Sequence, residues 1–141
     1  MEMINNVALL IERLNKDSKD LEAALSLGNL YYDKKDAGLS ILYYRLVLDI
    51  NSALPGVWTD MGTMYWQNGN VSIAEQSFRE AISRDSGFGQ AYVNLGLLLH
   101  HAQNKVADAR TVWQQLLDIN PDHMVAGKAR ELLQETASLA H

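Results

Sequence analysis

The chain has 141 residues, of which 48% are apolar and 21% are charged, and its net charge is −5 at pH 7. This composition is typical of one soluble globular domain and argues against disorder. Scattered lysines and arginines argue against nucleic-acid binding, which needs a basic stripe. The absence of cysteine excludes disulfides, thiolate zinc sites and cysteine nucleophiles. Since the sequence shows no signal peptide and no apolar run near the roughly 18–20 residues of a membrane span, we expect a soluble, cytoplasmic protein.

The first predicted element is an amphipathic helix over residues 4–15. Its apolar side chains recur at helical spacing, and they are Val7, Leu10, Ile11 and Leu14. The pair Asp17-Ser18 follows, in the position where later segments of the chain have a closing loop. We therefore interpret residues 1–20 as a leading capping helix, which forms the second half of an incomplete leading repeat.

Three glycines recur at intervals of 34 residues, and they are Gly28, Gly62 and Gly96. Around each glycine, an apolar stretch at helical spacing is followed by a polar break and a second apolar stretch. The second stretch carries an aromatic residue, which is Tyr44, Phe78 or Trp113, the last displaced by one extra residue in the turn. A glycine inside a helix costs roughly 1 kcal/mol relative to alanine. Its repetition predicts a close crossing of two helices, where a Cβ atom would clash.

This pattern resembles the tetratricopeptide repeat (TPR). The second repeat matches best, through Trp58, Met61, Gly62, Tyr65, Ala74 and Phe78. The first repeat departs from the family pattern at Ala24 and Ser40, and the third departs at Leu99 and at the inserted residue. The resemblance implies an all-α fold, a right-handed superhelical solenoid of about eight helices in one domain over residues 1–141. Its three helix–turn–helix repeats are placed at residues 21–54, 55–88 and 89–123.

The last predicted element is a helix that begins after Asp122, as its N-cap, and runs to about Ala137. It carries apolar residues on one side and charged residues on the others, with Arg130-Glu131 where a repeat would have Leu-Gly. Repeat arrays need such a polar helix at their end for solubility. We therefore interpret residues 124–141 as a C-terminal solvating helix.

The family resemblance also implies that the first helix of each pair lines a concave, peptide-binding groove. The predicted groove residues are Leu25, Asn29, Tyr32, Asp33, Thr59, Asp60, Thr63, Trp66, Gln67, Gln90, Val93, Asn94, Leu97, His100 and His101. Three of them, Tyr32, Trp66 and His100, occupy the same repeat position and would form a ladder along the groove. Amphipathic rings of this kind are favoured anchors at interfaces. The alternative is that these rings pack against the neighbouring helix pair and only close the groove wall.

Some TPR domains clamp the terminal carboxylate of a peptide with lysine, arginine and asparagine side chains. The corresponding positions in this chain are Leu25, Asn29, Asp60, Gln90 and Asn94. Two asparagines fit that pattern, but every cation is missing and Asp60 would repel an anion. The resemblance therefore predicts a near-neutral, partly apolar groove that suits an extended or helical peptide with apolar anchors and a basic residue.

No motif in the chain indicates catalysis or a bound cofactor. His100 and His101 are adjacent, so on a helix their side chains point about 100° apart and do not converge on one metal ion. Gly87-Phe88-Gly89 lacks the lysine and the strand context of a phosphate-binding loop. We therefore expect no enzymatic activity, no metal and no cofactor.

The predicted function is a non-catalytic protein–protein interaction module that binds a peptide segment of a partner protein, with no role for nucleic acid or membrane insertion. Two alternatives stay open at this point. The repeats could associate with copies of themselves to build an assembly scaffold, as a weak homo-oligomer instead of a monomer. The chain could also be the adaptor segment of a larger protein.

Overall fold

The computed structural model describes residues 2–139, with side chains from residue 6 onward, and these residues form eight α-helices, one short 3₁₀ helix and no strand. The helices are α1 (Glu2–Lys16), α2 (Leu21–Asp33), α3 (Ala37–Ile50), α4 (Pro55–Gln67), α5 (Val71–Arg84), α6 (Gly89–His101), α7 (Val106–Ile119) and α8 (Ala126–Glu135), followed by η1 (Ala137–Leu139). The prediction of an all-α array of about eight helices is confirmed.

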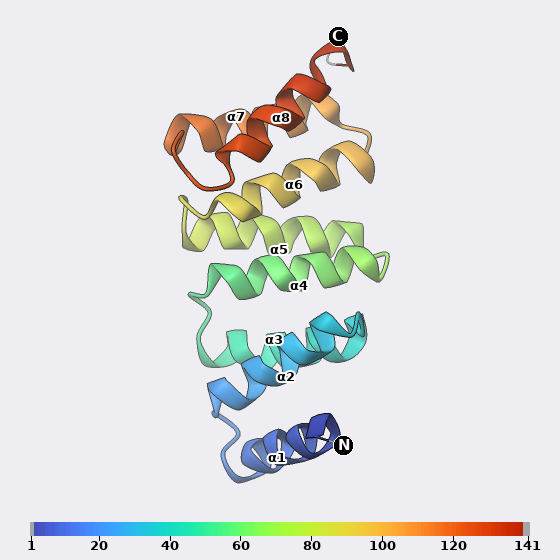
Figure 1. Ribbon diagram of the computed structural model, residues 1–141, viewed down its shortest axis with the longest axis vertical. Helices are drawn as coiled ribbons and strands as arrows, with labels where there is room; N and C mark the ends of the chain where they lie inside the picture. Colours follow the sequence, from blue (N-terminus) through green and yellow to red (C-terminus); the bar gives the residue numbers. More distant parts are fainter. Residues whose placement is uncertain (1, 140–141) are drawn as a thin grey trace.

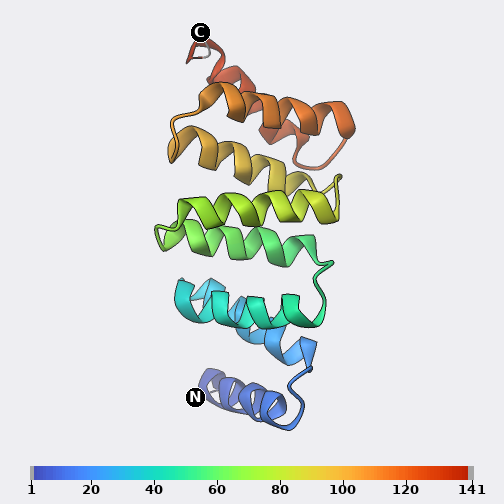
Figure 2. The same cartoon turned by 180° about the vertical axis from the view of Figure 1, so that it is seen from behind.

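The helices stack along one axis as a solenoid, with the first and last helices at opposite ends (Figure 1). From α2 onward, consecutive helices form the antiparallel pairs α2–α3, α4–α5 and α6–α7. The first helices of the pairs lie on one side of the stack, and the second helices face the viewer when the molecule is turned around (Figure 2). Because no pair covers its own apolar face, each one packs against the next.

Each repeated glycine lies where the two helices of a pair cross. A Cβ atom on Gly28 would lie 2.6 Å from the ring of Tyr44, and one on Gly62 would lie 2.7 Å from the ring of Phe78. A Cβ atom on Gly96 would overlap the indole ring of Trp113. All three rings are fully buried. The crossing predicted from the 34-residue spacing is therefore present in each pair, since only a glycine leaves room for the ring.

A residue with a left-handed backbone conformation lies in the turn after the first helix of each pair. These residues are Lys35, with φ 60°, Gly69, with φ 85°, and Asn104, with φ 53°. The turns after α2 and α4 have three residues, whereas the turn after α6 has four, so the extra residue of the third repeat lies in this turn. The left-handed geometry turns the chain back, and it allows the N–H of Asn70 to donate to the carbonyl of Tyr65 at 2.8 Å.

The two ends of the array are tied to their neighbours by charged side chains. The guanidinium of Arg13 donates to both carboxylate oxygens of Asp20 at 3.0 Å, and Asp20 caps α2 by accepting the N–H of Ala23 at 3.0 Å. At the other end, Arg110 of α7 donates to the carbonyl of Leu133 and to the hydroxyl of Thr136. The ends are therefore held by polar contacts as well as by apolar packing.

The C-terminal helix begins later than the sequence predicts. Asp122 is not its N-cap, because residues 121–125 form turns and α8 starts at Ala126. In these turns, Nδ1 of His123 accepts the N–H of Val125 at 3.1 Å, and this imidazole also lies against Gly89. The helix ends at Glu135, before Ala137. Residues 1, 140 and 141 of the predicted flanking segments lie outside the described residues.

Candidate functional site

The candidate site is the surface formed by α2, α4 and α6, which we call the inner face (Figure 1). Along it, α4 contacts α6 directly. The structure brings all predicted groove residues to these three helices. They are Leu25, Asn29, Tyr32 and Asp33 on α2, Thr59, Asp60, Thr63, Trp66 and Gln67 on α4, and Gln90, Val93, Asn94, Leu97, His100 and His101 on α6.

Polar side chains connect the three helices of the inner face. Nδ2 of Asn94 on α6 lies 3.5 Å from the hydroxyl oxygen of Thr63 on α4. Nε2 of Gln90 donates to Oδ1 of Asn94 at 2.8 Å, which orients the amide of Asn94. Farther along, Nε2 of Gln67 on α4 donates to the carbonyl of Lys35, in the turn after α2, at 2.9 Å. These contacts hold the polar part of the face in one arrangement.

Asp60 is the charged group whose surroundings differ most from water. It is partly buried, close enough to Asp33, Tyr32 and Tyr44 for these groups to influence one another's titration. Burial, and then the charge of Asp33, raise the pKa of Asp60 from 3.8 to about 6. Among the described residues, no side chain or backbone N–H donates a hydrogen bond to Asp60, and no cation pairs with it. The inner face therefore carries a poorly solvated carboxylate without a counter-charge.

Two tyrosines flank this carboxylate from α2 and α3. The rings of Tyr32 and Tyr44 are 6.4 Å apart, and the hydroxyl of Tyr44 donates to Oδ1 of Asn29 at 2.6 Å. Burial raises the pKa of Tyr32, and the charges of Asp60 and Asp33 raise it further. A partly buried carboxylate to which no described side chain is paired is suited to hold a cation, which supplies the missing charge.

The three members of the predicted ladder share a repeat position but differ in their contacts. Tyr32, Trp66 and His100 are each partly buried. Tyr32 packs against the core cluster of α2, α3 and α4, and Trp66 packs against the cluster formed by α5 to α8. Nδ1 of His100 is buried and, within the described part of the chain, has no hydrogen-bond partner. The ring of His100 lies 4.5 Å from that of His101. The exposed parts of these rings are available to a ligand.

Two predicted groove residues, Thr59 and Val93, do not reach the surface. Their side chains are 2% and 3% exposed. The hydroxyl of Thr59 donates to the carbonyl of Pro55 at 2.9 Å, and Val93 belongs to the core cluster of α5 to α8. At the equivalent place on α2, Leu25 stays partly exposed, because only α1 precedes it.

Tyr44 of α3 supports the inner face from beneath through a contact that the sequence prediction missed. It belongs to the second helix of its pair and was assigned to the crossing beneath Gly28. Its ring is fully buried there, but its hydroxyl reaches Asn29 on α2. One feature of the sequence indicates this contact. Tyr44 has a hydroxyl group at the repeat position where the second repeat has Phe78, and a buried phenol needs a polar partner.

The described residues contain no group of three or more His, Asp or Glu side chains arranged to hold a metal ion. Nor does any described helix have both the length and the apolar character that crossing a membrane would require.

Comparison with known proteins identifies the repeat. Two family models, both described as tetratricopeptide repeat, match residues 16–54 and 59–123, and together they cover more than two thirds of the chain. The chain belongs to the tetratricopeptide repeat family. A curated relative, Tetratricopeptide repeat protein 8 of Caenorhabditis elegans, is 24% identical over 79% of this chain. The match spans 29% of that relative's length.

Solved TPR structures share the fold. The crystal structure of MamA has a TM-score of 0.79 at 19% identity, covering 95% of this chain and 78% of MamA. The first TPR of Spaghetti, bound to the HSP90 peptide SRMEEVD, has a TM-score of 0.69 at 21% identity, covering 86% and 96%. The TPR2B domain of yeast Sti1, in a complex with pHsp70, has a TM-score of 0.74 at 16% identity, covering 84% and 97%. At these identities the likeness concerns the fold alone.

Proposed function

We propose that this TPR domain is a non-catalytic protein–protein interaction module that holds a peptide segment of a partner on its inner face. Of the solved TPR domains with this fold, that of Spaghetti is bound to an HSP90 peptide and the TPR2B domain of Sti1 is in a complex with pHsp70. The repeats that hold the peptide are residues 21–54, 55–88 and 89–123. Residues 1–20 and 124–141 cap the two ends.

The observation that carries the proposal is the partly buried carboxylate of Asp60, which lies near Tyr32 and Asp33 and has no partner among the described residues. A partly buried charge without a counter-ion lowers the stability of the free protein, and a ligand with an ammonium or guanidinium group supplies the missing charge. The second acid, Asp33, adds to the attraction. The acidic peptide SRMEEVD seen with Spaghetti has the opposite character. The preferred peptide therefore has a basic residue that reaches Asp60 and an apolar residue that contacts Trp66.

The ligand preference is tested with a library of short peptides that differ only in one position, which is Lys, Gln or Glu. We expect the wild-type protein to bind the Lys peptides at least about tenfold more tightly than the Glu peptides, and Asp60→Asn to lose most of that preference. The preference should weaken as salt is added, because ions screen a partly exposed pair. Equal binding of Lys and Glu peptides by the wild-type protein would contradict the assignment of Asp60.

The apolar part of the site is tested with Trp66→Ala, which should weaken capture of the same Lys peptides at least about tenfold, as expected for an aromatic anchor at an interface. Trp66→Leu keeps part of the packing against the core and should show the same loss, which separates binding from folding. The matched control is Leu42→Ala, whose side chain is 57% exposed and which belongs to α3, a helix outside the inner face. Unchanged capture by folded Trp66→Leu would remove Trp66 from the site.

A further inference from the structure

Asp60 differs from the other partly buried acids of the chain. From residue 6 onward, four acidic residues are partly buried, and they are Asp20, Asp60, Glu75 and Glu80. Three of them pair with an arginine, which are Asp20 with Arg13 at 3.0 Å, Glu75 with Arg79 at 2.9 Å and Glu80 with Arg84 at 3.3 Å. Asp60 has no such partner within the described residues. Its charge is therefore balanced from elsewhere, either by a bound cation or by a proton.

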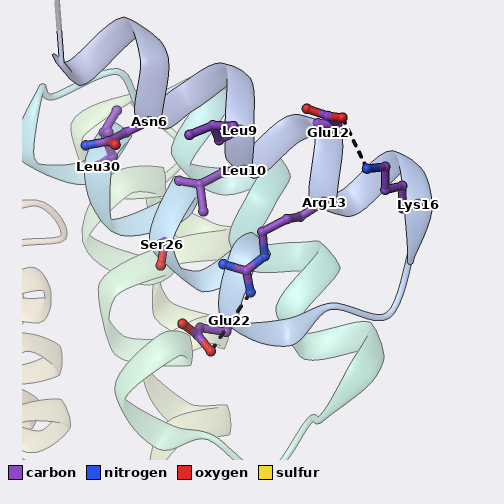
Figure 3. Close-up of a pocket in the computed structure, with 9 residues that line it drawn as sticks. All are labelled: Asn6, Leu9, Leu10, Glu12, Arg13, Lys16, Glu22, Ser26 and Leu30. Atoms are coloured by element: carbon purple, nitrogen blue, oxygen red, sulfur yellow. Dashed lines mark ion pairs between the residues drawn. The ribbon is translucent and has the colours of Figure 1, made fainter.

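The cavity between α1 and α2 shows the opposite arrangement. It has a volume of about 850 Å³ and is lined by two acids, Glu12 and Glu22. Figure 3 shows that both are paired, Glu12 with Lys16 at 3.2 Å and Glu22 with Arg13 at 3.9 Å. Because a base of the chain already accompanies each of these acids, a basic ligand gains less in this cavity than beside Asp60.

The titratable groups nearest to Asp60 come from α2 and α3. Asp33 and Tyr32 of α2 and Tyr44 of α3 are close enough to interact with its charge. Burial raises the pKa of both tyrosines, so their hydroxyls stay neutral around neutral pH. Asp33 is a second acid, and its charge favours the uptake of a proton by Asp60.

The other helices that pack against α4 bring few charges to the inner face. On α5, the four charged residues pair with one another. On α3, Arg45 and Asp49 line a hollow together with Trp58, whose side chain leaves α4 in nearly the opposite direction to that of Asp60. On α6, the titratable residues of the inner face are His100 and His101. Since histidine commonly changes its charge near neutral pH, these two are the alternative source of a pH effect.

A proton and a basic ligand compete for the carboxylate of Asp60. The ammonium group of a lysine stays charged far above neutral pH, whereas the carboxylate loses its charge when it takes up a proton. Burial, and then the charge of Asp33, raise the pKa of Asp60 to about 6, so this uptake takes place between pH 7.5 and pH 5. The protonated acid offers no charge to a cation.

We propose that binding of a basic peptide to the inner face is coupled to the release of a proton from Asp60, so that the peptide is held near pH 7.5 and released near pH 5. This inference rests on the proposed function of the inner face and adds its regulation by pH. A basic side chain that enters displaces the proton of a protonated Asp60, and one that leaves is replaced by a proton from the solvent.

The coupling is tested with the dissociation constants of the Lys and Gln peptides at pH 7.5 and pH 5.0, where circular dichroism verifies that the helices are intact. For the Lys peptides we expect a rise of about tenfold at pH 5.0, because roughly nine tenths of the free protein then holds the proton. For the Gln peptides, and for Asp60→Asn with either peptide, the change should stay below about twofold. Equal binding of Lys peptides at both pH values, or an unchanged pH effect in Asp60→Asn, would overturn the inference.

A double variant, His100→Gln with His101→Gln, separates Asp60 from the two histidines. It should keep the ratio of about tenfold between the two pH values, whatever its affinity at pH 7.5, because the ratio depends on Asp60. Loss of this ratio would assign the pH effect to the histidines and would also overturn the inference.

Titration calorimetry supplies a direct count of protons. In buffers with different enthalpies of ionisation at pH 6, the wild type should release about half a proton for each Lys peptide bound, and Asp60→Asn should release almost none. Binding without proton release would contradict the coupling. A missing preference for Lys over Gln at pH 7.5 would refute the proposed function itself, whereas a preference that persists unchanged at pH 5.0 would refute the coupling alone.

Discussion

The crossings inside the helix pairs and the inner face belong to the same helices, yet they vary very differently between repeats. At each crossing, a glycine lies under a buried aromatic ring, as in Gly28 with Tyr44 and Gly96 with Trp113. On the inner face, one repeat position holds Tyr32, Trp66 and His100 in turn. Close packing leaves few solutions, so the crossing recurs, whereas a partly exposed surface tolerates many side chains. Differences between repeats therefore concentrate on the surface where a partner would bind.

The largest effect is expected from a substitution that disrupts the crossing of the two helices in a pair. Gly96→Ala should lower the free energy of unfolding by about 2–3 kcal/mol, because the added methyl group overlaps the fully buried indole of Trp113, and this exceeds the gain in helix propensity. Chemical denaturation followed by circular dichroism measures the change. The matched control is Gly127→Ala on α8, where a Cβ atom meets no other atom within 4 Å, and it should be neutral or slightly stabilising. Similar effects of both substitutions would contradict the space limit at the crossing.

The second prediction concerns the inner face, where a substitution should stabilise the protein, in contrast to the destabilisation expected at a crossing. The pKa of Asp60 is about 6 in the folded chain and 3.8 in the unfolded chain, so the folded state holds a proton that the unfolded state releases between these pH values. The stability contributed by this group is therefore highest below pH 4 and falls as the pH rises through 6. At pH 7.5, Asp60→Asn should be more stable than the wild type by about 1–2 kcal/mol, after allowing for solvent screening.

Denaturation curves at pH 4 and pH 7.5 measure the effect of Asp60→Asn. The gain should be much smaller at pH 4, where Asp60 is protonated in the folded state and still partly protonated in the unfolded state. A gain of the same size at both pH values would show that the substitution acts through packing and not through charge. A gain at pH 7.5 together with weaker binding of Lys peptides would indicate that Asp60 is retained for binding at the expense of stability.

The smallest expected effect concerns Tyr44, which joins the two regions. Tyr44→Phe keeps the ring under Gly28 and makes the first crossing like the second, but it removes the hydrogen bond to Asn29. We expect a loss of about 0.5–1.5 kcal/mol in the free energy of unfolding. The control is Tyr43→Phe, since the Tyr43 ring stacks on Tyr31 at 5.9 Å and its hydroxyl has no hydrogen-bond partner within the described residues. Equal losses in both variants would show that the contact with Asn29 does not stabilise the protein.

Whether a predicted groove residue reaches the surface depends on the helices that precede it in the array. Leu25, Thr59 and Val93 hold the same repeat position, and the repeat pattern predicted all three as groove residues. The structure buries Thr59 and Val93, each of which follows a complete helix pair, and leaves Leu25 partly exposed, since α1 is the one described helix before it. The start of α8 was also misjudged, since His123 and its contact with Gly89 hold the chain in turns beyond Asp122.

The sequence by itself determined the helices, the turns between them and the crossings at Gly28, Gly62 and Gly96. These features depend on side chains at short, repeated spacings, and such spacings can be read along one chain. Only the tertiary structure decided the unpaired state of Asp60, the contact of Tyr44 with Asn29 and the open cavity beside α1. Each of these depends on which side chains from different helices meet and on how much water they exclude. Burial and pairing of this kind arise from packing between helices, which the order of residues specifies only through the fold.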